Sequence, residues 1–284
     1  GYVRNYGFEA MLSYRHRWGD FGWDSSFTFS TNKNEIVELV KDYIHPESGK
    51  TYNVDKLELK TDEGRGFGKA KFILKEGGTL GDLYTHADLK RDINGNVLVD
   101  NDGNVTAIDN AGDIKLGSVL PKANLAWNNS FSYKGVNVGF LLTARLGGIA
   151  YSATQAYLDL YGVSETSAAA RDAGGVWING RSRVNPQGFY SVVASQSGLP
   201  TYYTYSATNL RLQEARIGYT IPRRWLGNVC DVNVSLVGKN LWMIYCKAPF
   251  DPEAVATTNN YYQGIDYFMM PSTRNIGFNI KINF

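Results

Sequence analysis

The sequence contains no long uninterrupted apolar run, and this absence excludes a helical membrane protein. A membrane-spanning helix needs about 20 consecutive apolar residues, and no stretch of the 284 residues approaches that length. An excess of charge of one sign is missing too, because 29 Lys and Arg residues stand against 27 Asp and Glu residues. The chain therefore carries no electrostatic signature of binding to nucleic acid or to an anionic surface.

Cysteine is scarce, and the two cysteines are predicted to be unpaired. If Cys230 and Cys246 lie on one extended strand, they are about 50 Å apart at a rise of ~3.3 Å per residue. A disulfide tolerates no more than ~7 Å between the two Cα atoms. Two cysteines are too few to indicate the redox compartment.

Signatures of catalysis and of metal or cofactor binding are also lacking. The sequence has no glycine-rich phosphate loop, no CxxC pair and no G-x-S-x-G elbow. His16, His45 and His86 are scattered without metal-ligand spacing, so solvated positions in loops or at strand ends are expected for them. Asp251 and Glu253 flank a proline and are interpreted as the start of a loop. We predict a protein that is not an enzyme, with no catalytic residues, no metal and no cofactor.

The acidic segment 92–104 invites a calcium-binding interpretation, which its spacing does not support. An EF-hand loop needs glycine at its sixth position and glutamate at its twelfth. A loop that starts at Asp92 or at Asp100 has neither. We interpret Asn94-Gly95 and Asp102-Gly103 as tight hairpin turns instead.

The sequence does contain a regular alternation of apolar and polar residues, which is clearest in its last ten positions. Successive side chains of a strand point to opposite faces, so one face of segment 275–284 is apolar and the other is polar. This pattern is typical of a strand between lipid and water. The residues predicted to face lipid are Ile276, Phe278, Ile280, Ile282 and Phe284.

Similar alternation elsewhere in the sequence predicts about nine strands. Most of them are ~10–14 residues long, whereas strands of soluble sheets are usually ~5–6 residues long. Strands that cross a bilayer at a tilt need about 9–11 residues. Within 207–220 the apolar phase slips, which predicts a β-bulge near Gln213-Glu214. The other strands are predicted at 5–15, 23–30, 124–133, 136–146 and 230–243, with weaker ones at about 66–76 and 80–92.

Short and long connections alternate between these strands. Outer-membrane barrels have short periplasmic turns and long extracellular loops, and a periplasmic Phe284 would place every long connection outside. Arg223, Arg224 and Trp225 in one short turn are interpreted as interface anchors. The short connections are at 17–20, 77–79, 134–135 and 222–229, and the long ones at 34–65, 93–121, 148–206 and 244–272.

The long loops contain the helical and aromatic segments. Residues 152–172 are predicted to be helical, with Ser152 as N-cap. Aromatic faces in the loops stack on sugar rings or peptide side chains, although packing of the loops against each other would explain the same residues. The candidate substrate-binding residues are Trp177, Tyr190, Tyr202, Tyr203, Tyr261 and Tyr262.

Several ordered motifs resemble the C-terminal end of the SusC/RagA family of TonB-dependent outer-membrane transporters. They include "YSATNLRLQEARIGYTIPRRWL" (205–226), "VNVSLVGKNLWMIYCKAPFDPE" (232–253) and "MPSTRNIGFNIKINF" (270–284). Upstream, "ILKEGGTLGDLY" (73–84), "LGSVLPKANLAWNNSFSYKGVNVGF" (116–140) and "NYGFEAMLSYR" (5–15) fit in the same order. The resemblance covers nearly the whole chain.

The resemblance implies an all-β fold, namely the C-terminal portion of a large antiparallel transmembrane β-barrel of the 22-stranded type with long extracellular loops. It also implies a bacterial outer-membrane location, a SusD-like surface lipoprotein as partner, a plug, and energy from the TonB complex through an N-terminal region. The cargo implied is an oligosaccharide or a peptide.

The chain begins at Gly1 inside an alternating pattern, without an initiator Met or a signal-peptide segment. We therefore expect residues 1–284 to be the C-terminal part of such a barrel, without the plug and the N-terminal strands. An open half-barrel leaves two edges that lipid cannot satisfy, so the chain is expected to need the remaining strands.

Two other classes of protein compete with this interpretation. A soluble β-rich glycan-binding module would use the same strands and aromatic residues, and would be extracted without detergent. An outer-membrane enzyme such as a lipase-like barrel would need a nucleophile paired with a base, for which only the three histidines are candidates.

Overall fold

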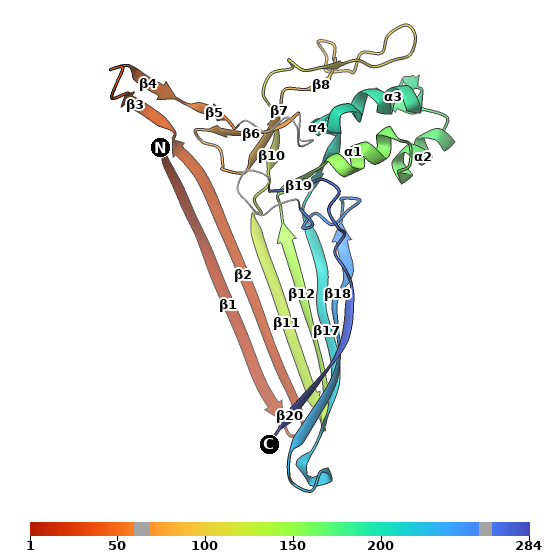
Figure 1. Ribbon diagram of the computed structural model, residues 1–284. Helices are drawn as coiled ribbons and strands as arrows, with labels where there is room; N and C mark the ends of the chain where they lie inside the picture. The colour runs from red at the N-terminus through yellow and green to blue at the C-terminus, as the bar shows by residue number, and fades with distance from the viewer. Residues whose placement is uncertain (60–68, 256–262) are drawn as a thin grey trace.

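The computed structural model describes residues 1–59, 69–255 and 263–284, and its main feature is one curved antiparallel sheet of seven strands (Figure 1). We call this sheet the wall. Its order is β1-β2-β11-β12-β17-β18-β20, so β1 and β20 form its two edges. The strands are β1 (Tyr2–Trp18), β2 (Phe21–Glu38), β11 (Ala123–Tyr133), β12 (Val136–Leu146), β17 (Asn209–Ile221), β18 (Asp231–Cys246) and β20 (Asn275–Asn283).

One face of the wall is apolar because the register of the strands sets apolar residues opposite one another. Residues opposite each other in a sheet share a face. One row of such partners crosses six strands and consists of Leu12, Phe27, Trp127, Leu142, Leu212 and Trp242. Nearer the other end of the wall, a second row consists of Val136, Tyr219, Val234 and Ile280.

The opposite face of the wall is polar, and its side chains bind one another across the strands. Arg15 forms an ion pair with Asp24 on the neighbouring strand, with 2.6 Å between Nη2 and Oδ2. Arg216 donates a hydrogen bond of 3.0 Å from Nη2 to Ser130 Oγ. Asn137 and Asn233 both donate to Thr220 Oγ1, at 3.0 and 2.9 Å. The alternation predicted from sequence is therefore the alternation of the two faces.

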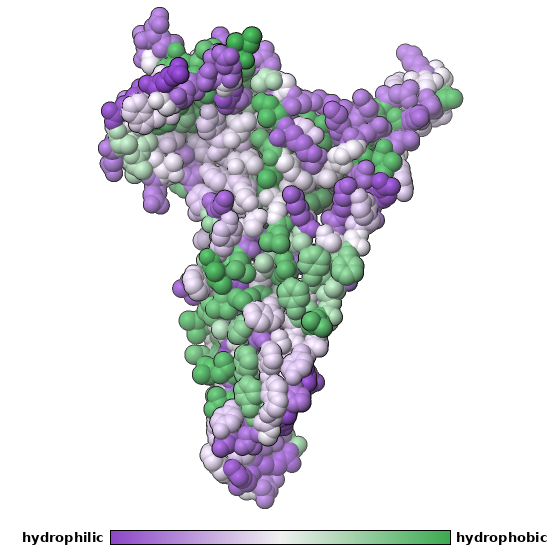
Figure 2. Space-filling view, turned by 180° about the vertical axis from the view of Figure 1, so that it is seen from behind, coloured by the Kyte–Doolittle hydropathy of each residue, from purple (hydrophilic) through white to green (hydrophobic). Residues whose placement is uncertain are grey.

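The apolar side chains of the wall do not form a buried core. Apart from Ile36, at one end of β2, the buried hydrophobic residues lie outside the seven strands. Phe278 remains 76% exposed and Leu12 73% exposed. Figure 2 shows the hydrophobic residues gathered over the strands, with hydrophilic residues beyond them at both ends.

Aromatic rings gather on the apolar face near the short turns. Trp18 packs on Phe21 with ring centroids 5.9 Å apart, and Trp23 stacks on Phe131 at 6.3 Å. Trp225, in the short 3-10 helix Arg223–Trp225, lies 6.3 Å from the ring of Tyr219. Aromatic belts of this kind mark the interface between a membrane and water.

Two tryptophans of this face, Trp23 and Trp127, donate hydrogen bonds from their indole N–H groups to polar neighbours. Trp23 Nε1 donates to Asn129 Oδ1 at 3.1 Å, and Trp127 Nε1 donates to Ser25 Oγ at 3.1 Å. An unpaired N–H in an apolar environment is costly. This requirement explains why Ser25 and Asn129 interrupt an otherwise apolar alternation.

All long connections leave the wall at the same end, and all short ones at the other (Figure 1). We call the long connections, at 39–59, 69–122, 147–208, 247–255 and 263–274, the cap. The short turns lie between β1 and β2, β11 and β12, and β17 and β18. This arrangement confirms the predicted placement of the short connections at 17–20, 134–135 and 222–229. The short connection predicted at 77–79 is a correction, because it joins β6 to β7 within the cap and bonds to Ile36 at the cap end of β2.

The cap consists of small sheets and four helices. Its strands are β3 (Val40–Ile44), β4 (Thr51–Val54), β5 (Lys56–Glu58), β6 (Ala70–Lys75), β7 (Asp82–Thr85), β8 (Asp88–Leu89), β9 (Ala107–Ile108), β10 (Ile114–Ser118), β13 (Ile149–Ser152), β14 (Val176–Ile178), β15 (Ser182–Val184), β16 (Thr204–Ser206) and β19 (Ile265–Asp266). Its helices are α1 (Ala153–Leu160), α2 (Glu165–Asp172), α3 (Pro186–Val193) and α4 (Pro200–Tyr203).

The molecule's apolar cores lie in the cap. One packs around Phe72, Leu83, Val119, Tyr151 and Ile265. The other joins α3 to the hairpins near β8, with members that include Leu89, Val105, Val184, Phe189 and Leu199. The cap is therefore a folded body with its own interior.

The prediction of about nine strands in one barrel needs a correction. The segments 66–76 and 80–92 contain β6 and β7, which pair with β5 and β10 in a separate four-stranded sheet of the cap. Leu83 and Phe72 are fully buried there. These strands are short and buried on both sides, so their apolar residues form a core.

Three local predictions are confirmed. Leu141 pairs with Glu214 and Leu142 with Leu212, so Gln213 is the extra residue of a β-bulge in β17. Ser152 is the N-cap of α1, and its hydroxyl accepts a hydrogen bond from Gln155 N. Both predicted hairpin turns have glycine at positive φ, 82° at Gly95 and 80° at Gly103.

No helix in the described part of the chain is long and apolar enough to span a membrane. Both cysteines are free, and they lie at opposite ends of β18, with Cys246 as its last residue and Cys230 just before its first.

Candidate functional site

The polar face of the wall is hollowed next to the cap. The hollow has a volume of about 670 Å³ and is lined by β1, β2, β11, β12 and the connection after β18. Its charged lining residues are Glu9, Arg145 and Glu253, accompanied by threonine, serine and asparagine side chains. Arg145 is fixed by a hydrogen bond of 2.7 Å from Nη2 to Val119 O. Apolar residues, among them Met11, Phe29 and Leu125, complete the lining, so the hollow suits a ligand with both polar and apolar groups.

A buried ion-pair cluster lies beside this hollow and ties the cap to the wall. Arg211 of β17, with its side chain 5% exposed, pairs with Asp251 at 2.7 Å and with Glu253 at 3.3 Å. Its other terminal nitrogen donates to Asn240 Oδ1 at 2.7 Å. One guanidinium thus holds the connection after β18 and a residue of β18 itself.

Asp251 stays charged in this cluster. Burial alone would raise the pKa of its carboxyl group, but hydrogen bonds from Arg211, from Ser272 and from the Glu253 N–H outweigh burial and lower the pKa below its ordinary value. The carboxylate is therefore present at neutral pH, and it neutralises Arg211. The ion pairs of Arg211 with Asp251 and Glu253 fix this connection to the wall and position Glu253 at the hollow.

Sequence reasoning missed this cluster. The segment Asp251-Pro252-Glu253 was interpreted only as the start of a loop, and Arg211 only as part of a strand. The useful signal is an arginine near the loop end of a strand together with two carboxylates just beyond the next strand.

The predicted loop aromatics fall into two groups. Tyr203 and Tyr190 are buried, and Tyr203 donates its hydroxyl to Asp159 Oδ2 at 3.0 Å. In this structure both pack the interior of the cap. Trp177 is 61% exposed with the Arg183 guanidinium 5.8 Å from its ring, and Tyr202 is half-buried against Phe189. Tyr261 and Tyr262 lie outside the described residues.

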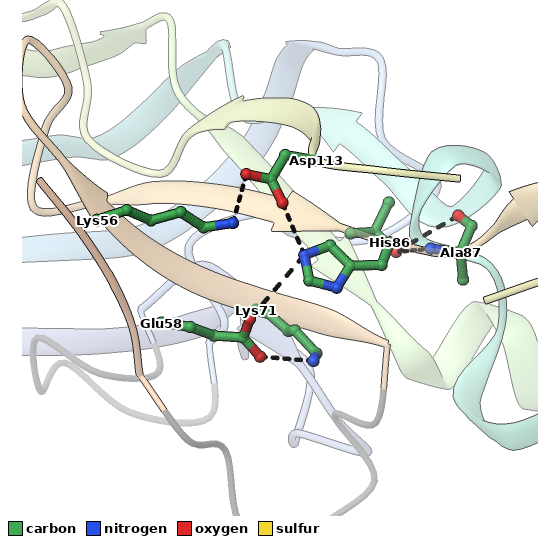
Figure 3. A network of polar contacts seen from close by, with 7 residues as sticks. Lys56, Glu58, Lys71, His86, Ala87 and Asp113 are labelled. Carbon is green, nitrogen blue, oxygen red and sulfur yellow. Dashed lines mark hydrogen bonds and ion pairs between the residues drawn. The ribbon is translucent and has the colours of Figure 1, made fainter. Parts of the chain in front are cut away.

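His86 belongs to a network of charged side chains in the four-stranded sheet of the cap (Figure 3). Its Nε2 lies 2.9 Å from Asp113 Oδ1 and 3.9 Å from Glu58 Oε2. Lys56 pairs with Asp113 at 2.6 Å, and Lys71 with Glu58 at 2.5 Å. His86 directly follows β7 and its side chain is 28% exposed, so it occupies a strand-end position as expected, and carboxylates on two neighbouring segments converge on its ring.

The other two histidines have no charged partner in this network. His16 packs against Trp18 on the apolar face, with centroids 4.4 Å apart. His45 accepts hydrogen bonds at Nδ1 from the Glu47 and Ser48 N–H groups, within its own turn. Among the residues that the structure describes, no group of His, Cys, Asp and Glu has the arrangement of a metal site.

The network around His86 predicts an acid-sensitive cap. The hydrogen bond from Lys56 lowers the pKa of Asp113 below its ordinary value of 3.8. A carboxyl group with a lowered pKa in the folded state stabilises it above the pKa of the unfolded state, and this contribution is lost as the pH falls through the folded value. The protection of the β7 amides against hydrogen exchange, expressed relative to their intrinsic exchange rate at each pH, should therefore fall below about pH 4.

The matched control for this acid effect is Asp113→Asn. Asp92 also has a lowered pKa, because of hydrogen bonds from Asn96, and the pKa of Asp251 is lowered as described above, so the cap contains other acid-sensitive carboxylates. Only the difference between the unmodified protein and Asp113→Asn isolates the network. Equal pH profiles for the two proteins would contradict the assignment.

No protein-family model matches the chain. Curated relatives do match it over nearly its whole length. TonB-dependent receptor P3 of Formosa agariphila is 25% identical over 309 residues, which cover 99% of this chain and 29% of the relative. TonB-dependent receptor P26 of the same organism is 25% identical over 308 residues, covering 100% of this chain and 29% of that receptor. The chain thus spans less than a third of the length of these relatives.

Solved structures agree on the fold. The RagAB peptide transporter matches with a TM-score of 0.66 at 18% identity, over 99% of this chain and 29% of that one. The RagAB peptide importer in its 'closed-closed' state matches with a TM-score of 0.65 at 17% identity, over 99% of this chain and 30% of that one.

The wall and its cap therefore define a class of protein: they are part of a large antiparallel outer-membrane β-barrel, left open at both edges in this chain. The resemblance inferred from the motifs is confirmed as well. The chain is similar over nearly its whole length to part of TonB-dependent receptors, and it shares its fold with part of the RagAB transporter.

Proposed function

We propose that this chain forms part of the wall and of the extracellular surface of a TonB-dependent nutrient importer. The observation that carries the proposal is the continuous apolar face of the wall, which has no covering core. A soluble glycan-binding module would have to leave this face in water, although large exposed apolar patches mark interaction or membrane surfaces. A bilayer covers such a face without any further protein.

In this proposal the apolar face contacts lipid, including Ile276, Phe278, Ile280 and Ile282 of β20 and the following Phe284. The polar face lines the aqueous interior, and the hollow at Glu9, Arg145 and Glu253 lies on the path of the cargo. Further strands pair with β1 and β20, because backbone groups inside a bilayer must be satisfied by hydrogen bonds. Residues 1–284 are thus the C-terminal part of the barrel.

The proposed partners lie outside this chain. They are the plug and the remaining strands, the TonB complex that contacts a region beyond residues 1–284, and a SusD-like lipoprotein on the extracellular side. The cargo is a glycan or a peptide, and the similarity in fold to the RagAB peptide importer makes a peptide a specific candidate. Of the predicted loop aromatics that the structure describes, exposed Trp177 and half-buried Tyr202 remain candidates to touch it.

Selective labelling tests the orientation on which this proposal depends. In the complete receptor with both native cysteines replaced by serine, Ile93→Cys should react with a membrane-impermeant maleimide on intact cells, because Ile93 is fully exposed at a turn of the cap. Asp20→Cys, in the short turn between β1 and β2, should react only after the outer membrane is permeabilised. The reverse pattern would invert the barrel, and equal labelling of both on intact cells would contradict a membrane-spanning wall.

A further inference from the structure

The helices of the cap surround a buried carboxylate that has no cationic partner among the residues that the structure describes. Asp159, in the last turn of α1, is 4% exposed. Its Oδ1 accepts hydrogen bonds from Gln155 Nε2, at 3.0 Å, and from the Ser164 hydroxyl. Its Oδ2 accepts the bond from Tyr203 described above. None of the ion pairs in the described part of the chain involves Asp159.

These hydrogen bonds fix the carboxylate but supply no positive charge. Gln155, Ser164 and Tyr203 are all neutral donors, and three bonds leave one acceptor position of the carboxylate free. Buried charges in proteins are normally paired with an opposite charge or bind a cation. The residues around Asp159 therefore leave room for a cation that the described part of the chain does not supply.

Asp159 lines a hollow between α1, α2 and α3. The hollow has a volume of about 250 Å³, roughly that of eight water molecules. Ser167 and Tyr190 form buried parts of its lining, and Tyr161, which is 74% exposed, lies at its rim. A ligand can therefore enter this hollow from solvent and reach the carboxylate of Asp159 in its lining.

The nearest guanidinium in this hollow is already engaged. Arg171, an exposed residue of α2, donates from Nη1 to Gly162 O at 2.7 Å. It forms no ion pair with Asp159, and its remaining N–H groups are donors for an oxygen acceptor. The lining thus combines the Asp159 carboxylate, which can pair with a cationic group of a ligand, with the Arg171 guanidinium, which can donate to a carbonyl oxygen of the same ligand.

We propose that this hollow is a binding site for a primary ammonium group, such as the free amino terminus of a peptide. Asp159 pairs with the ammonium, and the volume admits one amino-acid-sized unit, so the first residue of a peptide enters the hollow while the following residues stay outside it. The proposal goes beyond import, because the site would bind its ligand whether or not the receptor transports it.

The test measures binding of tetra-alanine amide to the complete receptor in detergent micelles by calorimetry. The peptide with a free amino terminus should bind at least tenfold more tightly than its N-acetylated form, and Asp159→Asn should abolish that preference. Asp172→Asn, an exposed change on α2 that is not part of the lining, should keep it. Equal binding of both peptides by the unmodified receptor would overturn the proposal, and this comparison does not depend on any variant folding.

A second pair of ligands identifies the source of the ammonium group. Glucosamine carries an ammonium that N-acetylglucosamine lacks. Tighter binding of the free peptide than of glucosamine would assign the site to peptides, and the reverse order would assign it to amino sugars. Retention of the preference for free amines by a folded Asp159→Asn receptor would show that Asp159 is not the partner and would sink the proposal.

Discussion

Replacing Ile280 with arginine is expected to lower the free energy of unfolding of the complete barrel by about 2–4 kcal/mol, the cost of an arginine on the lipid face near the bilayer midplane. Ile280 lies on the apolar face of β20, opposite Val234. Asn279→Arg, one position away, should cost far less, because Asn279 lies on the polar face opposite Ser235. Urea unfolding of the barrel in lipid vesicles measures both changes.

Neighbouring positions on one strand make these two substitutions closely matched. They add the same charged side chain at nearly the same depth, so only the face differs. Equal losses of stability at 279 and 280 would mean that the wall does not separate lipid from water. The same comparison is available on a central strand with Phe27→Arg and Thr28→Arg, since Phe27 faces Leu12 and Trp127.

The second large effect is expected at Arg211. Arg211→Met leaves Asp251 as a buried carboxylate without its partner, and removal of one member of a buried ion pair costs about 3–5 kcal/mol. The connection after β18 should detach from the wall, so protease sensitivity near residue 251 should rise along with the loss of stability. Thermal unfolding followed by gel mobility in dodecyl sulfate, together with limited proteolysis, measures both effects.

Arg216→Met is the matched control for this experiment. Arg216 lies on the same strand and also faces the polar side, but it is exposed and donates only to Ser130. Its loss should cost well under half as much, since exposed polar contacts contribute little to stability. If Asp251→Asn combined with Arg211→Met is no more stable than Arg211→Met alone, the unpaired carboxylate is not the source of the loss.

The features of the wall could be predicted from the sequence because they are local. Alternation with a period of two residues determines which side chains share a face, so the apolar face and the slip at Gln213 are both visible in the order of residues. The N-cap at Ser152 is equally local. The lengths of the connections predict which end of the wall has the long loops and which has the short turns.

The cap could not be predicted in the same way, because its interior depends on contacts between distant segments. β6 and β7 are apolar segments like those of the wall, and what separates them from it is their pairing in another sheet and their burial against α1 and β13. Asp113 approaches His86 through the pairing of β10 with β7. The sequence gives no sign that distinguishes Tyr203 and Tyr190 from Trp177, yet the fold buries the two tyrosines and exposes the tryptophan.

The unequal lengths of the connections have a consequence for the order of assembly. The two-residue turn Lys134-Gly135 makes β11 and β12 a hairpin that closes readily, whereas β2 and β11 meet only across residues 39–122. That connection is roughly forty times longer, and its closure costs about 3 kcal/mol more in chain entropy. The cap offsets part of this cost, because Ile36 and Gly77–Gly78 are joined by two backbone hydrogen bonds and Thr31 binds Lys122 O at 2.6 Å. We therefore expect the seam between β2 and β11 to close after the hairpin of β11 and β12, once the cap has folded and drawn the two ends of the connection together.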